Sequence, residues 1–73
     1  MKWHYTENDD FPDEHYDSSE DFLGVTRKFQ ECLLLSCFIG DGDWQNVWSG
    51  HLYERYEIKK WISLREVLDN IED

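Results

Sequence analysis

The pattern of apolar and polar positions predicts β-strands from residue 22 onward. Strand-favouring residues dominate 22–29 and again 30–39, with a more polar break at 28–31. Two such runs with a short polar break between them are typical of a β-hairpin. Residues 40–43 are Gly-Asp-Gly-Asp, in which glycine permits positive φ and Asp bonds its own backbone. We therefore expect a second tight turn there, followed by another strand.

Two further strands and a helix are expected in the second half of the chain. The third strand would run from 44 to about 48 or beyond, before the break at Ser49-Gly50, and a fourth is favoured over 56–62, where side-chain types alternate. Ser63 and Glu66 have the spacing of a capping box, in which each side chain satisfies a backbone amide at a helix start. Apolar residues at helical spacing follow, so we expect a short helix over 63–72 whose apolar stripe packs on the sheet.

The first 21 residues, called the arm below, differ in character from the rest. Pro12 and a run of Asn, Asp and Ser oppose regular structure there. Four rings are nevertheless too apolar for a plain disordered tail: Trp3, Tyr5, Phe11 and Tyr16. We predict an α+β fold in a single domain, 1–73. It would combine an irregular acidic arm (1–21), a small antiparallel β-meander of three to four strands (22–62) and a short C-terminal helix (63–72).

Size and charge narrow the classes of function. The chain has 73 residues, room for one domain, and its four Trp, four Tyr and four Phe build a core from few residues. Its formal net charge is −10, from 17 acidic and 7 basic residues. Such a field repels nucleic acid and anionic membranes, and it speeds encounter with basic surfaces, which in cells belong mostly to nucleic-acid-handling proteins. We expect no direct binding of nucleic acid or membrane.

Most of the negative charge lies in the arm, which carries eight acids against Lys2. Carboxylates at this spacing along an extended chain approximate the charge density of a duplex, about one per 1.7 Å of axis. We therefore predict that the arm and the 40–43 turn occupy a basic groove of a nucleic-acid-binding protein. A solubilising surface and other protein contacts are alternative roles for the same charge. The predicted partner-binding residues are Asp9, Asp10, Asp13, Glu14, Asp17, Glu20, Asp21, Asp41 and Asp43.

Nothing in the sequence directs the chain to a membrane or out of the cytoplasm. The longest apolar stretch, 33–39, is far below the roughly 18 residues that cross a bilayer, and the N-terminus lacks a secretory signal pattern. We expect a cytoplasmic protein in which Cys32 and Cys37 are reduced. Five residues apart on one strand, they would point to opposite faces, which argues against a disulfide between them.

Catalytic and metal-binding roles find little support. His4, His15 and His51 do not combine with the two cysteines at the short spacings that preorganise a zinc site. The stretch 9–21 lacks the alternating ligands, central Gly and closing Glu of a calcium loop. A core this small rarely forms a substrate pocket. We expect no enzyme activity, no catalytic residue, no metal and no cofactor.

The tryptophans are expected mainly in the core. Trp44 and Trp48 would share one face of a regular strand, and Trp61 would lie opposite Ile58 and Ile62 unless a bulge intervenes. One ring could therefore stay exposed as an interface anchor, since Trp is enriched at binding hot spots.

Several short motifs resemble those of a family of phage proteins. The chain has Trp3 near its start, then Phe11-Pro12, Phe22-Leu23-Gly24, Gly-Asp-Gly-Asp-Trp at 40–44, and Trp61-Ile62-Ser63-Leu64 near its end. It thereby resembles short phage and prophage proteins of unassigned function that open with a Trp and a Pro, pass through a β-meander and close on Trp-x-x-Leu. The chain differs in a longer acidic insertion before Phe22 and in a helical, not proline-rich, ending. The resemblance implies a mobile-element origin and a small β-rich fold, and no particular activity.

By size and charge alone, the chain also resembles the inhibitors that phages direct against bacterial defence nucleases, including anti-CRISPR proteins. This likeness implies an acidic DNA mimic in the cytoplasm of a bacterial host, a monomer or weak homodimer. It would inhibit a nucleic-acid-handling defence protein, above all a CRISPR effector, by occupying its basic groove. The alternative from another class is a small structural or accessory phage protein that self-associates through a sheet edge or an exposed Trp.

Overall fold

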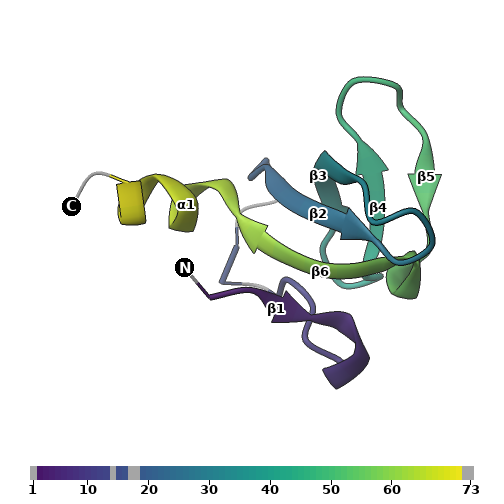
Figure 1. Cartoon of the computed structure of the whole chain (residues 1–73), viewed down its shortest axis with the longest axis horizontal. Coiled ribbons are helices and arrows are strands. Elements are labelled where there is room, and N and C mark those ends of the chain that lie inside the picture. The colour runs from purple at the N-terminus through teal and green to yellow at the C-terminus, as the bar shows by residue number, and fades with distance from the viewer. Residues whose placement is uncertain (1, 14, 17–18, 72–73) are drawn as a thin grey trace.

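The computed structural model describes residues 2–13, 15–16 and 19–71 and has the α+β class that the sequence predicts (Figure 1). Within these residues, six strands form one antiparallel sheet in the order β1-β6-β2-β3-β4-β5. The strands are β1 (His4–Tyr5), β2 (Phe22–Thr26), β3 (Cys32–Phe38), β4 (Asp43–Asn46), β5 (Leu52–Tyr53) and β6 (Ile58–Ser63). The helices are the 3₁₀ turns η1 (Thr6–Asn8) and η2 (Arg55–Glu57) and the α-helix α1 (Leu64–Ile71). No helix in the described part of the chain has the length and apolar character needed to cross a membrane.

The prediction of three to four strands is wrong. It missed two of the six strands, β1 and β5, because they are very short. β1 and β5 each pair with one neighbour over two residues, too few for an alternating pattern to be visible in the sequence. They form the two edges of the sheet. β1 and η1 also correct the prediction that the arm is irregular, since both lie within it.

The expected hairpin and the 40–43 turn are present, but the strands are shorter than predicted. β2 ends before Phe29, which lies exposed in the turn. β4 ends at Asn46, two residues earlier than expected. The Asn46 side-chain oxygen accepts hydrogen bonds from the backbone N–H groups of Trp48 (2.8 Å) and Ser49 (3.1 Å), which turns the chain there.

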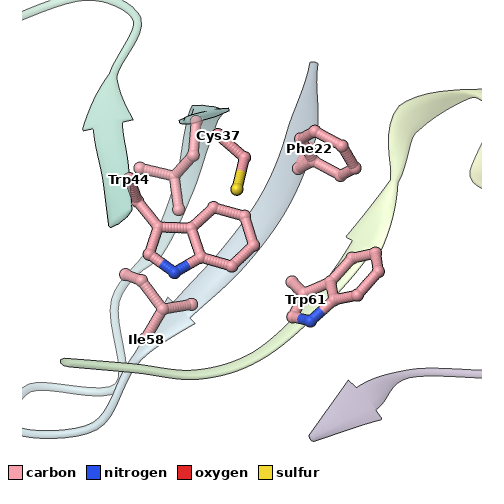
Figure 2. Close-up of a cluster of buried hydrophobic side chains, with 6 residues drawn as sticks. Phe22, Cys37, Trp44, Ile58 and Trp61 are labelled. Carbon is pink, nitrogen blue, oxygen red and sulfur yellow. The ribbon is translucent and has the colours of Figure 1, made fainter. Parts of the chain in front are cut away.

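The sheet curls around its core. β4 and β6 are separated by two strands, so a flat sheet would hold them roughly 14 Å apart. Yet the ring centroids of Trp44 on β4 and Trp61 on β6 are 6.0 Å apart, with the Phe22 ring of β2 within 6 Å of both. Figure 2 shows these rings converging with Ile58 in one cluster. The rings therefore fill the concave face of a half-closed sheet.

A β-bulge brings Ile58 and Trp61 to the same side of β6. β2 pairs with β6 on both sides of Lys59 but not with Lys59 itself, which makes it the extra residue. Without the bulge, the two side chains would face opposite ways, as the alternation in the sequence predicts. The buried hydroxyl of Thr6 donates to the carbonyl oxygens of Ile58 (2.6 Å) and Lys59 (3.1 Å). The arm therefore supplies a hydrogen-bond partner to the distorted part of β6.

The C-terminal helix begins as predicted but packs less than predicted. Ser63 Oγ accepts a hydrogen bond from the Glu66 N–H at 3.0 Å, which satisfies one amide at the helix start. α1 continues directly from β6 and extends beyond the end of the sheet (Figure 1). Val67 is therefore buried, whereas Leu68 and Ile71 are exposed, so the expected packing of a whole apolar stripe on the sheet is wrong.

Gly24 allows the close packing of β2 against the core. A Cβ at this position would lie 2.4 Å from Leu35 Cδ1 and 3.0 Å from Ile58 Cγ2. Both neighbours are fully buried, so neither can move without disturbing the cluster. The position requires a residue without a side chain.

We expect Gly24→Ala to lower the free energy of unfolding by about 1–3 kcal/mol, because the added methyl group overpacks the core. Urea denaturation followed by Trp fluorescence measures this change. An unchanged midpoint would show that Leu35 and Ile58 can move aside, and would contradict the close packing described here.

Candidate functional site

The arm is a folded layer on the core and is anchored by Trp61. The Trp61 indole N–H donates to the backbone carbonyl of Asp10 at 2.7 Å, and the His4 ring stacks on the indole with centroids 4.2 Å apart. Tyr16 contacts the same indole edge-on at 5.6 Å. Residues from three parts of the arm thus meet one ring, which holds each of these parts against the core.

A second set of contacts holds the middle of the arm. The Phe11 ring packs against the core cluster and meets the Tyr56 ring edge-on at 5.5 Å. The Tyr56 hydroxyl donates to Asp9 Oδ1 at 2.5 Å, and this bond to a carboxylate raises the pKa of Tyr56. Phe11 therefore faces the protein, while the carboxylates of Asp9, Asp10 and Asp13 lie at the surface.

Three predicted site residues gather around one hollow. Asp9, Asp10 and Asp13 line a shallow depression of about 610 Å³, which we call the arm hollow. The remaining lining residues are Phe11, Pro12, Ile39, Gly40, Gly42 and Arg55. The structure thus brings the arm next to the 40–43 turn, although the two are about 30 residues apart in sequence.

The charge of the arm hollow is negative despite the presence of one cation. Arg55 donates to the backbone carbonyl of Asp41, and its guanidinium lies 5.5 Å from the Phe11 ring. The Asp13 carboxylate accepts a hydrogen bond from the His15 N–H at 2.9 Å, and this bond is the main cause of a lowered pKa at Asp13. Asp13 therefore remains ionised at neutral pH.

The 40–43 turn contributes its carboxylates to a different hollow. Asp41 and Asp43 line a depression of about 580 Å³, which we call the edge hollow because it lies beside the edge strand β5. The other lining residues are Phe38, Leu52, Tyr53, Glu54 and Glu57. Glu54 and Glu57 were not predicted as site residues. Their spacing is that of a capping box at the start of η2. This signal predicts where a helix begins, but it does not predict which surface the two side chains will share.

Two predicted site residues, Glu20 and Asp21, contact the helix α1 and line neither of these two hollows. Glu20 forms an ion pair with Arg65 of α1 at 3.3 Å, and the Asp21 carbonyl accepts a hydrogen bond from the Leu64 N–H at 3.0 Å. Both residues are half-buried at the junction between the arm and α1. Glu14 and Asp17 lie outside the described residues. The nine predicted residues therefore do not form one continuous surface among those that the structure describes.

A further hollow is not acidic. It measures about 800 Å³ and lies between the β2–β3 turn, β5 and η2. Its charged side chains balance, with Arg27, Lys28 and Arg55 against three glutamates. Arg27 is also held within the protein, by hydrogen bonds to the Tyr56 carbonyl and the Thr6 hydroxyl. This hollow therefore offers no excess charge to a partner.

The two cysteines occupy different environments on β3. Cys32 is exposed and Cys37 is buried against the core cluster, and both are free thiols. Burial, with a smaller contribution from the charge of Asp43, raises the pKa of Cys37 to about 12. Within residues 2–13, 15–16 and 19–71, no group of three or more His, Cys, Asp or Glu side chains could hold a metal ion.

The chain was compared with known protein families, curated proteins and solved structures. No family model, no curated protein and no solved structure matches it. Any function must therefore be argued from the surface described above.

We expect iodoacetamide to alkylate Cys32 rapidly at pH 8 and to leave Cys37 unmodified in the folded protein, because only the thiolate reacts and burial keeps Cys37 protonated. Mass spectrometry of the digested protein measures the site and rate. In denaturant, both thiols should react. Equal rates in the folded protein would contradict the burial of Cys37.

Proposed function

We propose that this chain is a cytoplasmic binding protein whose acidic arm competes with nucleic acid for a basic groove on a nucleic-acid-handling protein. A CRISPR effector of a bacterial host is the partner that we put forward first, in keeping with the size and charge of the chain. The activity would be inhibition by occupation of the groove, without catalysis.

The observation that carries this proposal is the grouping of Asp9, Asp10 and Asp13 around the arm hollow. All three side chains are exposed. The ring contacts of the arm hold their backbone in place, so little conformational entropy would be lost when a partner binds. A rigid group of carboxylates can replace phosphates at a surface of Lys and Arg residues.

Because the arm is folded, its carboxylates would not replace the phosphates of a nucleic acid in the way that an extended arm would. An extended arm would present carboxylates in a line, as along one strand of a duplex. In the structure, the arm turns back at Asp9, whose φ is 56°, and Asp9, Asp10 and Asp13 form a compact group. We therefore propose that the arm hollow covers a short part of a groove, such as an entry point, and not the whole length of a duplex.

A second candidate is a small accessory protein that self-associates. It is favoured by Trp48, a residue 84% exposed on a loop that is held by hydrogen bonds to the Asn46 side chain. Leu52, 62% exposed, lies on the edge strand β5 nearby in sequence. Association through these residues would use apolar surface and would tolerate salt, whereas occupation of a basic groove would weaken as salt rises.

The arm proposal predicts that the chain displaces labelled target DNA from a purified, guide-loaded CRISPR effector. Asp10→Asn/Asp13→Asn should weaken this displacement by about tenfold or more, because two exposed charges that would face the groove are removed. A panel of effector types, assayed by fluorescence anisotropy at low and high salt, measures the competition.

The matched control is Glu31→Gln/Asp69→Asn, which removes the same charge from exposed positions outside the arm hollow. It should displace DNA as well as the unmodified chain does. If both variants lost the ability to displace DNA to the same extent, the displacement would depend on net charge alone and not on the arm hollow. Displacement from no member of the panel would contradict the proposed function for this class of partner.

A further inference from the structure

We propose that the β5 edge of the sheet is a docking site for an extended segment of a partner protein in which apolar and basic residues alternate. The inference goes beyond the proposed function, because it uses the edge hollow and none of the carboxylates of the arm hollow. Three features of the edge support it: the direction of its backbone groups, its exposed apolar side chains and its charge.

The backbone of Leu52 points away from the sheet. The Asn46 N–H donates to the His51 carbonyl at 2.8 Å, so the His51 carbonyl points toward β4 at a hydrogen-bonded position, although the Asn46 carbonyl accepts from the Gly50 N–H and not from His51. In an antiparallel ladder, hydrogen-bonded and non-hydrogen-bonded pairs alternate. Leu52, which pairs with Gln45, is therefore in a non-hydrogen-bonded pair. Its N–H and C=O face outward, where a residue of an added strand could bond to both.

Two exposed apolar side chains lie on one face beside this edge. Gln45 is paired with Ser36 on one side and with Leu52 on the other, so these three side chains share a face. Phe38 lies two residues beyond Ser36 on β3 and is on that face as well. Phe38 is 45% exposed and Leu52 is 62% exposed. Both line the edge hollow, and Leu52, on β5 itself, would meet the side chains of an added strand, while Phe38 extends the apolar lining of the hollow away from the edge.

The charge of the edge hollow favours basic residues at those positions of the partner segment that alternate with its apolar residues. Asp41, Asp43, Glu54 and Glu57 all line it, and among the described residues its lining includes no Lys or Arg. A partner segment with Lys or Arg next to its apolar residues would pair these carboxylates while it covers Leu52. An acidic or purely apolar segment would leave the four carboxylates partly desolvated and unpaired, which is costly.

A second copy of this chain fits the edge poorly. A symmetric β5–β5 pairing would set the same acidic surface of each copy against the other, since a two-fold interface uses one patch twice. Like charges brought together across strands are destabilising, and each copy already carries a net charge of −10. Charge complementarity therefore favours a basic partner over self-association.

The probe for this site is an eight-residue, fluorescein-labelled peptide that alternates Val and Lys. One control peptide has the same composition arranged as four Val followed by four Lys. Another carries N-methyl groups on alternate amides, which removes the donors of one strand edge and keeps the charge. We expect the alternating peptide to bind the full chain, and both controls to bind about tenfold more weakly or less.

Variants of the chain locate the binding. Asp43→Asn/Glu54→Gln should weaken binding of the alternating peptide by about tenfold, and Glu7→Gln/Asp69→Asn, which removes the same charge elsewhere, should not. Gln at position 54 keeps an acceptor for the Glu57 N–H, so the start of η2 is preserved. In NMR spectra, the backbone amides of Leu52 and Tyr53 should shift most when the peptide is added.

Equal binding of the three peptides would overturn the proposal, since it would show charge attraction without strand addition. Shifts centred on the arm hollow would also overturn it. A dimer in sedimentation velocity that the peptide dissociates would show that a second copy occupies the edge instead. Because the arm variant Asp10→Asn/Asp13→Asn leaves this edge intact, failure of the arm proposal and failure of this one are distinguishable.

Discussion

The structure depends on one tryptophan, Trp61, which joins the sheet, the core and the arm. Its ring lies in the core between β4 and β6, it stacks on His4, and its indole N–H bonds to the Asp10 carbonyl. In a chain this short, the sheet alone buries little apolar surface, so a ring that contacts several segments stabilises each of them. The bulge at Lys59 brings Ile58 to the same side of β6 as Trp61, and Thr6 of the arm bonds the carbonyls at that bulge. The arm and the core therefore require each other.

This dependence explains how so acidic a chain can fold. Phe11 and Tyr16 of the arm pack against the core cluster, while the carboxylates of Asp9, Asp10 and Asp13 are exposed, so much of the charge is carried on a folded layer. The same separation produces two acidic hollows with different chemistry, the arm hollow and the edge hollow. The arm hollow displays carboxylates from a fixed backbone, whereas the edge hollow combines carboxylates with exposed apolar side chains and outward backbone groups. Both hollows are suited to basic partners, and they differ in the shape of segment that each would accept.

The sequence could predict the elements whose signals are local. The hairpin, the 40–43 turn and the start of α1 depend on residues within a few positions of one another, and all three are present. β1, β5 and the bulge in β6 depend on partners far along the chain, as with the bond between Thr6 and Ile58 across 52 positions. The arrangement of the candidate site residues also depends on contacts between distant parts of the chain. The acids could be counted, but their division into two hollows, with Glu20 held by Arg65, follows from tertiary contacts.

The central claim is that the acidic arm is a folded layer of the domain, and amide hydrogen exchange measured by NMR tests it most directly. The Asp9 N–H bonds to the Thr6 carbonyl and the Tyr16 N–H bonds to the Asp13 carbonyl, each within the arm. The account predicts that these amides exchange slowly, with opening free energies close to those of β6, because the arm and β6 open together. Exchange of both amides at the rate of an unprotected chain, while β6 stays protected, would contradict it.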